Sequence, residues 1–107
     1  MYEYKAVVIK VYDGDTIHVD ISLGFGVILH KQKIRLLGIN APEVRGKSKQ
    51  AGKESRDRLK EKILDQEIIL KTFKDKKGKY GRWLGIIILD DVNINDWMVE
   101  NNLAVKY

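Results

Sequence analysis

Residues 5–22, KAVVIKVYDGDTIHVDIS, predict a β-hairpin at the start of the chain. The first half is rich in Val and Ile, which favour strands. In the second half Ile17, Val19 and Ile21 alternate with polar residues, which is the pattern of a half-buried strand. The Asp-Gly pair between the two halves is typical of a tight turn. Two antiparallel strands therefore begin the fold.

The rest of the chain continues this mainly β pattern with some α-helix. The further elements that we expect are a strand over 27–39, a helix over 48–64, strands over 67–73 and 83–89, and a short helix over 95–102. Three meandering strands, a helix and a closing pair of strands suit a five-stranded barrel of the OB type. A short C-terminal helix completes this architecture.

Two details of the helices follow from local patterns. Ala51, Ser55, Leu59 and Ile63 recur every four residues, which predicts a narrow buried stripe on the longer helix. Asn95 stands where the short helix is expected to begin, and Asn is a preferred residue at a helix N-terminus. We therefore expect Asn95 to cap that helix.

Composition limits the classes of function. A chain of 107 residues is expected to form one domain, residues 1–107. It has no cysteine, which excludes disulfides and thiolate metal sites, and its net charge of +5 favours polyanionic partners such as nucleic acid. The start of the chain has no signal-peptide pattern, and its longest apolar run, 83–89, is too short to span a bilayer. We expect a soluble monomer, cytoplasmic by default.

Arg35 is unusual because it interrupts an apolar strand, in KIRLLGINAPE over residues 33–43. One interpretation is structural, with its head at the solvent or in an ion pair. The other is that its planar guanidinium points into a pocket and binds phosphate. The residues alone leave both open.

Two carboxylates follow breaks in the strand pattern. Asp15, in the DGDT sequence of residues 13–16, is either an ordinary turn residue or a ligand for a hard cation such as Ca²⁺. Glu43, just after Pro42, is either simply solvated or orders a water molecule for attack on phosphorus.

The segment KDKKGKYGR, residues 74–82, is most simply a solvated hairpin tip. Its lysines and arginine around Tyr80 also suit a nucleic-acid backbone and its bases.

Taken together, DGDT, RLLGINAPE, the lysine-rich helix, KYGR and the closing VNINDWMVENNLA resemble the staphylococcal nuclease (thermonuclease) family, in the same order and over essentially the whole chain. The resemblance implies an OB-type barrel with packed helices. It also implies a Ca²⁺-dependent phosphodiesterase that acts on DNA and RNA, with other divalent cations as alternatives.

Roles for individual residues are implied by the same resemblance. Asp15 would be a metal carboxylate, and the backbone carbonyl of Ala41 a further metal ligand. Arg35 and Arg82 would bind the scissile phosphate, and Glu43 would be the general base. The remaining residues implied are Lys79 and Tyr80 as substrate contacts and Asp13 as a supporting acid.

Asn40 departs from the family pattern, which usually has a metal-binding aspartate here. An amide oxygen can still bind Ca²⁺, but it brings no charge. Two functions therefore remain: an active metal-dependent nuclease of low sequence specificity, or a weakened OB module that only binds nucleic acid or protein. A third, membrane binding through the basic helix, is disfavoured because the apolar face of that helix is narrow.

Overall fold

The computed structural model describes residues 2–74 and 83–107, which form strands and helices in one connected fold. The elements are β1 (Tyr2–Asp13), β2 (Thr16–Gly24), β3 (Val27–Leu36), β4 (Ile39–Asn40), η1 (Gly46–Ser48), α1 (Lys49–Ile63), β5 (Glu67–Lys74), β6 (Trp83–Leu89), β7 (Val92–Asn93), α2 (Ile94–Glu100) and β8 (Val105–Lys106).

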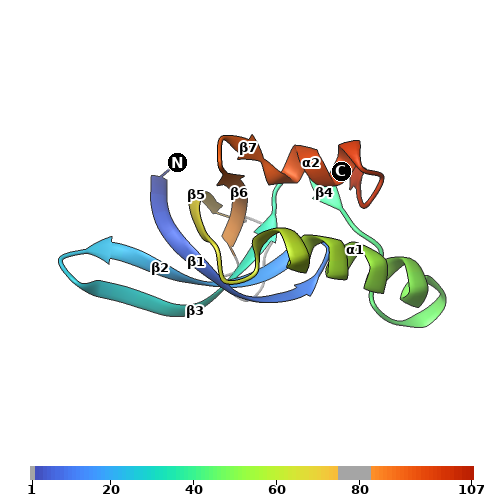
Figure 1. The fold of residues 1–107 in the computed structure, drawn as a ribbon, viewed down its shortest axis with the longest axis horizontal. Helices are drawn as coiled ribbons and strands as arrows, with labels where there is room; N and C mark the ends of the chain where they lie inside the picture. The colour runs from blue at the N-terminus through green and yellow to red at the C-terminus, as the bar shows by residue number, and fades with distance from the viewer. Residues whose placement is uncertain (1, 75–82) are drawn as a thin grey trace.

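The five long strands close into a barrel, which confirms the predicted fold class. Their order is β3-β2-β1-β5-β6, and a parallel pairing between β3 and β6 closes the ring. Closure removes the two exposed sheet edges that an open sheet would present. The β2–β3 hairpin extends beyond the barrel, whereas α1 follows β4 and lies along the second half of β1 (Figure 1).

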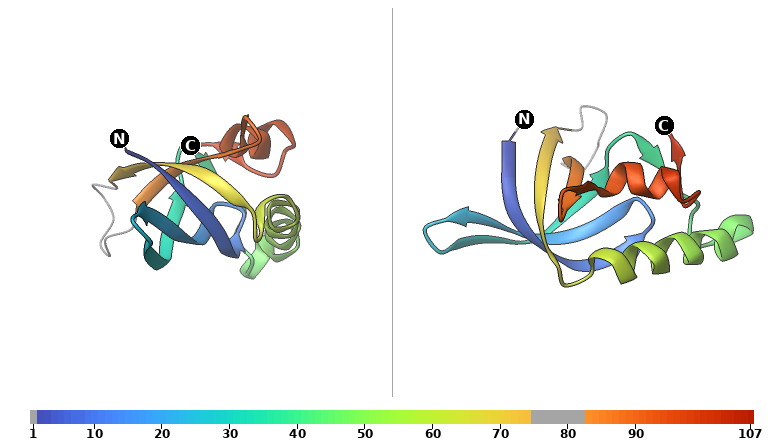
Figure 2. Two further views of the ribbon diagram at one scale, coloured as in Figure 1. Left: turned by 60° about the vertical axis from the view of Figure 1, so that its left-hand side comes forward. Right: turned by 45° about the horizontal axis from the view of Figure 1, so that its top comes forward.

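The core consists of inward-facing strand residues covered by the two helices. Val8, Ile17 and Ile34 of the strands are fully buried, as are Leu59 of α1 and Met98 of α2. In the left view of Figure 2, α1 is seen along its axis beside the barrel, with α2 on the same side. The helices therefore cover the end of the barrel at which β1 turns into β2.

The predicted strand over 27–39 is in fact two strands. β3 ends at Leu36, and Gly38 has a φ of +79°, a conformation that glycine adopts readily. The chain then enters β4, which pairs with β8 in a separate two-stranded sheet. This break turns the residues that follow Arg35 back toward its side chain.

Both helices differ in detail from the expectation. The buried stripe of α1 contains Gly52 in place of Ala51. At Gly52 a Cβ atom would collide with the carbonyl oxygen of Glu43, so the helix approaches that loop closely. Only the first predicted position differs, because this contact admits only glycine, and Ser55, Leu59 and Ile63 are buried as predicted.

The expectation that Asn95 caps α2 is wrong. Asn93 is the N-cap, and its side chain accepts a hydrogen bond from the N–H of Asp96. Asn95 is instead buried within the helix and contacts β6. Over residues 2–74 and 83–107, none of the helices has the length and apolar character needed to cross a membrane.

Candidate active site

Asp15 lies between β1 and β2 and is almost fully buried. One carboxylate oxygen accepts from the Thr16 hydroxyl at 3.1 Å. The other accepts from the N–H of Ala41 at 2.8 Å and lies 3.3 Å from Nη1 of Arg35. The turn between β1 and β2 therefore meets the end of β3 and the residue after β4 at this carboxylate.

Gly14 explains why the turn can reach this position. A Cβ atom at Gly14 would lie 2.7 Å from Cβ of Ala41 and 2.9 Å from Cβ of Ser55. Ser55 is itself held by a hydrogen bond of 2.6 Å from its hydroxyl to the carbonyl of Leu103. The DGDT turn thus packs closely between Ala41, just after β4, and α1, and this packing holds Asp15 next to Ala41.

Arg35 is held at one edge of its guanidinium. Nη1 donates to the carbonyls of Leu36 at 3.2 Å and Ile39 at 3.0 Å, and Nη2 donates to Oδ1 of Asn40 at 3.2 Å. Because the break between β3 and β4 curls around the side chain, these acceptors come from its own neighbours. The arginine is half-buried with fixed partners and does not simply extend into solvent.

The opposite edge of the same guanidinium comprises Nε and the second N–H of Nη2. Within residues 2–74 and 83–107, neither of these groups has a hydrogen-bond acceptor. Two parallel N–H groups of this kind match two oxygens of a phosphate. The described part of the site therefore leaves one bidentate edge of Arg35 for an anion.

Asp13 lies beside Asp15 and is coupled to it. The Oδ1 atom of Asp13 accepts from the backbone N–H of Asp15 at 3.1 Å. Burial, followed by interaction with the Asp15 carboxylate, raises the pKa of Asp13 to about 6. Two acids close together in a partly buried turn make the site favourable for positive charge.

The remaining predicted site residues are not brought to this cluster by any described side-chain contact. Glu43 is exposed, and the hydrogen bond at this residue runs from the Ser48 hydroxyl to its backbone carbonyl, at 3.0 Å. Lys79, Tyr80 and Arg82 lie outside the described residues. The roles expected of all four remain predictions.

Tyr107 lies beside Arg35, although it is not among the predicted site residues. Its backbone N–H donates to the carbonyl of Gly38 at 3.0 Å, next to the β4–β8 pairing. Its ring centre lies 6.0 Å from the guanidinium carbon of Arg35, within the range of a cation–π contact. The ring is 88% exposed, so it lies at the entrance to the site. Only the pairing of β4 with β8 reveals this proximity.

The donor set fits a hard cation in chemistry but supplies few ligands. Asp15, Asn40 and the Ala41 carbonyl are oxygen donors, as Ca²⁺ prefers, but Ca²⁺ takes six to eight ligands. Among the described residues, no three His, Cys, Asp or Glu side chains are grouped to hold a metal ion. The Arg35 guanidinium also bonds to Asn40 and lies beside Asp15. A bound cation would therefore share these oxygens with Arg35 and depend on water for other ligands.

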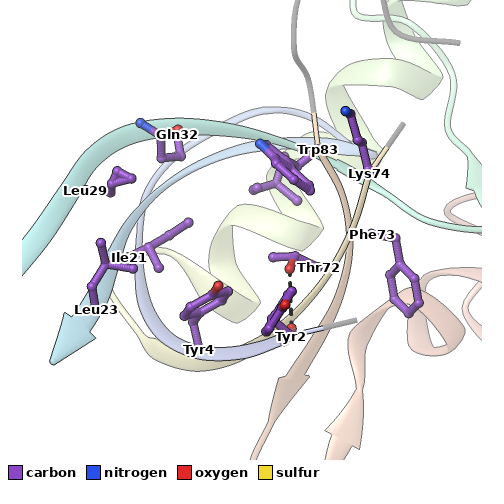
Figure 3. Close-up of a pocket in the computed structure, with 11 residues that line it drawn as sticks. Tyr2, Tyr4, Ile21, Leu23, Leu29, Gln32, Thr72, Phe73, Lys74 and Trp83 are labelled. Carbon is purple, nitrogen blue, oxygen red and sulfur yellow. Dashed lines mark hydrogen bonds between the residues drawn. The ribbon is translucent and has the colours of Figure 1, made fainter. Parts of the chain in front are cut away.

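A separate, largely apolar cavity of about 570 Å³ opens at the other end of the barrel. Trp83 lies on one side of it, with Tyr2 and Tyr4 on the other (Figure 3). Ile34 contributes to its lining, and Arg35 follows on the opposite face of β3. Of the predicted site residues that the structure describes, none lines this cavity.

The chain is similar in sequence to proteins that are named as nucleases. Endonuclease YhcR of Bacillus subtilis (strain 168) is 32% identical over 115 residues, covering 98% of this chain and 9% of that protein. Thermonuclease of Staphylococcus hyicus is 32% identical over 100 residues, covering 91% of this chain and 56% of that enzyme. Thermonuclease of Staphylococcus intermedius is 29% identical over 98 residues, covering 89% of this chain and 55% of that enzyme.

The chain thus spans just over half the length of these thermonucleases and a small part of the endonuclease. The family described as staphylococcal nuclease homologue matches residues 33–107, which include Arg35, Asn40 and Glu43. With a closed five-stranded barrel and this match over more than half of its length, the chain belongs to the staphylococcal nuclease family.

Proposed function

We propose that this chain is a metal-dependent nuclease that hydrolyses phosphodiester bonds of DNA or RNA with little sequence preference. The observation that supports this most strongly is the guanidinium of Arg35, which is fixed at one edge and has no acceptor at the other edge among residues 2–74 and 83–107. The names of its relatives, thermonuclease and endonuclease, support the same class of reaction.

Arg35 would bind the phosphate undergoing attack. The transition state of phosphodiester hydrolysis carries more negative charge on the phosphoryl oxygens than the substrate does. A guanidinium already held by Leu36, Ile39 and Asn40 needs little reorganisation to stabilise that charge. We propose Arg82 as a second such cation, with Lys79 and Tyr80 as contacts to the substrate strand.

Asp15, Asn40 and the Ala41 carbonyl would hold Ca²⁺ or another divalent cation, with Asp13 supporting the Asp15 turn. When bound, a divalent cation supplies Lewis-acid stabilisation of a phosphoryl oxygen. Glu43 would accept the proton of the attacking water as general base. In this proposal the protein acts as a monomer.

The test is cleavage of single-stranded DNA with Ca²⁺, and again with EDTA. We expect cleavage that EDTA abolishes. Arg35→Lys keeps the charge but loses the planar fork, and should lower kcat by about 10²–10³-fold, as for loss of a preorganised donor to a developing anion. Arg45→Lys, at an exposed loop position, is the matched control and should cleave like the unaltered protein. Absence of EDTA-sensitive cleavage with every divalent ion tried would refute the proposal.

A second function, binding without cleavage, is favoured by one contact. Asn40 already accepts from Arg35, which also lies beside Asp15, so an arginine partly fills the place of a cation. A module of this kind would bind single-stranded DNA in a salt-sensitive way without turnover. The cleavage assay and a binding assay on the same preparation separate the two functions.

A further inference from the structure

A groove of about 530 Å³ runs between the second half of β1 and the helix α1. Lys10 and Tyr12 of β1 line one side, and Arg56 and Lys60 of α1 line the other. In Figures 1 and 2 these two elements lie side by side. The groove is thus a described surface in which basic and aromatic side chains occur together.

The groove adjoins the candidate active site along the chain. Tyr12 immediately precedes Asp13, and Val44, which also lines the groove, immediately follows Glu43. Lys10 is three residues from Asp13, a reach of roughly 10 Å along a strand. The groove therefore begins next to the turn that carries Asp13 and Asp15.

The charges along the groove favour a polyanion. Arg56 and Lys60 are four residues apart and so share one face of α1. Arg56 forms an ion pair with Asp57 at 3.0 Å, whereas no ion pair involves Lys10 or Lys60 among the described residues. Nζ of Lys10 lies 5.9 Å from the centre of the Tyr12 ring. Two lysines and an exposed aromatic ring are therefore available to a ligand.

The positive field reaches the neighbouring strand. Lys10 is paired with His18 in the β1–β2 register. Burial, followed by the charges of Lys10 and Lys33, lowers the pKa of His18. Burial is the larger cause, and the two lysines add a positive charge on this face of the barrel that an anion in the groove would also meet.

We propose that this groove binds the single-stranded nucleic acid that flanks the phosphate held by Arg35. Lys10 and Lys60 contact backbone phosphates, and a base stacks on Tyr12. This inference rests on the proposed function for the identity of its ligand. It adds a substrate-binding track that lies outside the cluster of Asp15, Arg35 and Asn40.

The first test is binding of a fluorescent oligothymidylate of roughly eight nucleotides, within the site size of OB folds. Affinity is measured across a range of salt concentrations, in the presence of EDTA so that metal-dependent cleavage cannot occur. Each lysine that contacts a phosphate contributes about 0.7 to the slope of log affinity against log salt for a single strand. The double variant Lys10→Gln/Lys60→Gln should therefore lower the magnitude of the slope by about 1.4.

The matched control is Lys5→Gln/Lys53→Gln, which makes the same charge change on the same two elements outside the groove. Its slope should stay that of the unaltered protein. Tyr12→Leu should weaken binding about fivefold with the slope unchanged, because stacking does not release counterions. Circular dichroism confirms that all variants are folded. Equal slopes for the two double variants, or no binding by the unaltered protein at low salt, would overturn the inference.

Cleavage separates failure of this inference from failure of the proposed function. If the protein cleaves DNA, the groove variant should lose much of its preference, in kcat/KM, for the oligonucleotide over a dinucleotide, and the control should keep it. Cleavage with that preference unchanged in the groove variant would refute the groove and leave the nuclease intact. If the groove variant lowers the salt slope but no cleavage is seen, the proposed nuclease activity is refuted and the binding role of the groove stands.

Discussion

Replacing the buried Asn95 with alanine should strongly destabilise the protein. The Asn95 side chain accepts from the N–H of Ile87 at 3.1 Å and donates to the carbonyls of Leu37 at 2.9 Å and Gly85 at 3.0 Å. It thereby ties α2 to β6 and to the turn between Arg35 and Asn40. The side chain is only 3% exposed, so water cannot readily replace these bonds.

The magnitude follows from the groups that are left behind. Gly85 keeps one partner, because its carbonyl also accepts from the N–H of Leu37 at 2.8 Å. The N–H of Ile87 and the carbonyl of Leu37 lose the contact that Asn95 supplies. Three lost bonds at about 1 kcal/mol each give about 3 kcal/mol. The better helix propensity of alanine offsets about 0.5 kcal/mol of this.

We therefore expect Asn95→Ala to lower the free energy of unfolding by about 2–3 kcal/mol, a large part of the 5–15 kcal/mol typical of a domain. Urea unfolding, followed by tryptophan fluorescence and fitted with a common m-value, measures the change. Asn101→Ala is the control, because its side chain bonds to Trp97 at the exposed end of the same helix. A loss of less than about 1 kcal/mol, or equal losses in both variants, would refute the account of Asn95 as a buried cross-link.

Three further predictions concern the hairpin, the candidate metal site and the turn. The N–H of Lys31 donates to Asp20 and lowers the pKa of that carboxyl. Asp20 therefore stabilises the fold above its unfolded pKa of about 3.9, and this contribution is lost as the pH falls through the lowered pKa of the folded state. The stability advantage over Asp20→Asn in urea unfolding should shrink as the pH falls, and a constant difference would contradict this. Asn40→Asp adds a charged oxygen and should tighten Ca²⁺ binding by about tenfold or more in calorimetry; an unchanged affinity would mean that position 40 does not face the ion. Gly14→Ala forces a methyl group against Ala41 and should cost about 1–3 kcal/mol in urea unfolding, which an unchanged midpoint would exclude.

Local pattern was sufficient to predict most of the architecture. The alternation of Ile17, Val19 and Ile21, the Asp-Gly turn and the helical composition after Ser48 specify elements that form largely from near neighbours. The order of these elements then favoured the five-stranded barrel, and the parallel pairing of β3 with β6 confirms it.

The errors arose where a residue acts through a distant partner. Asn95 is of a residue type that often forms a helix N-cap, yet closure of the barrel places β6 beside α2 and buries the amide between them. Ala51 lost its place in the buried stripe to Gly52 because the loop at Glu43 packs against the helix there. Helical spacing indicates which positions share a face but not which neighbour will cover that face.

The candidate site divides in the same way. The sequence by itself determined the residue types, including Asp15, Arg35 and the uncharged Asn40. Only the tertiary structure decided that Asn40 bonds to Arg35, that the N–H of Ala41 bonds to Asp15, and that Tyr107 stands at the entrance. Asp15 and Ala41 are 26 residues apart, Asn40 reaches Arg35 through the break at Gly38, and the place of Tyr107 depends on the pairing of β4 with β8. Local preference cannot encode these contacts because their geometry exists only after the barrel has closed.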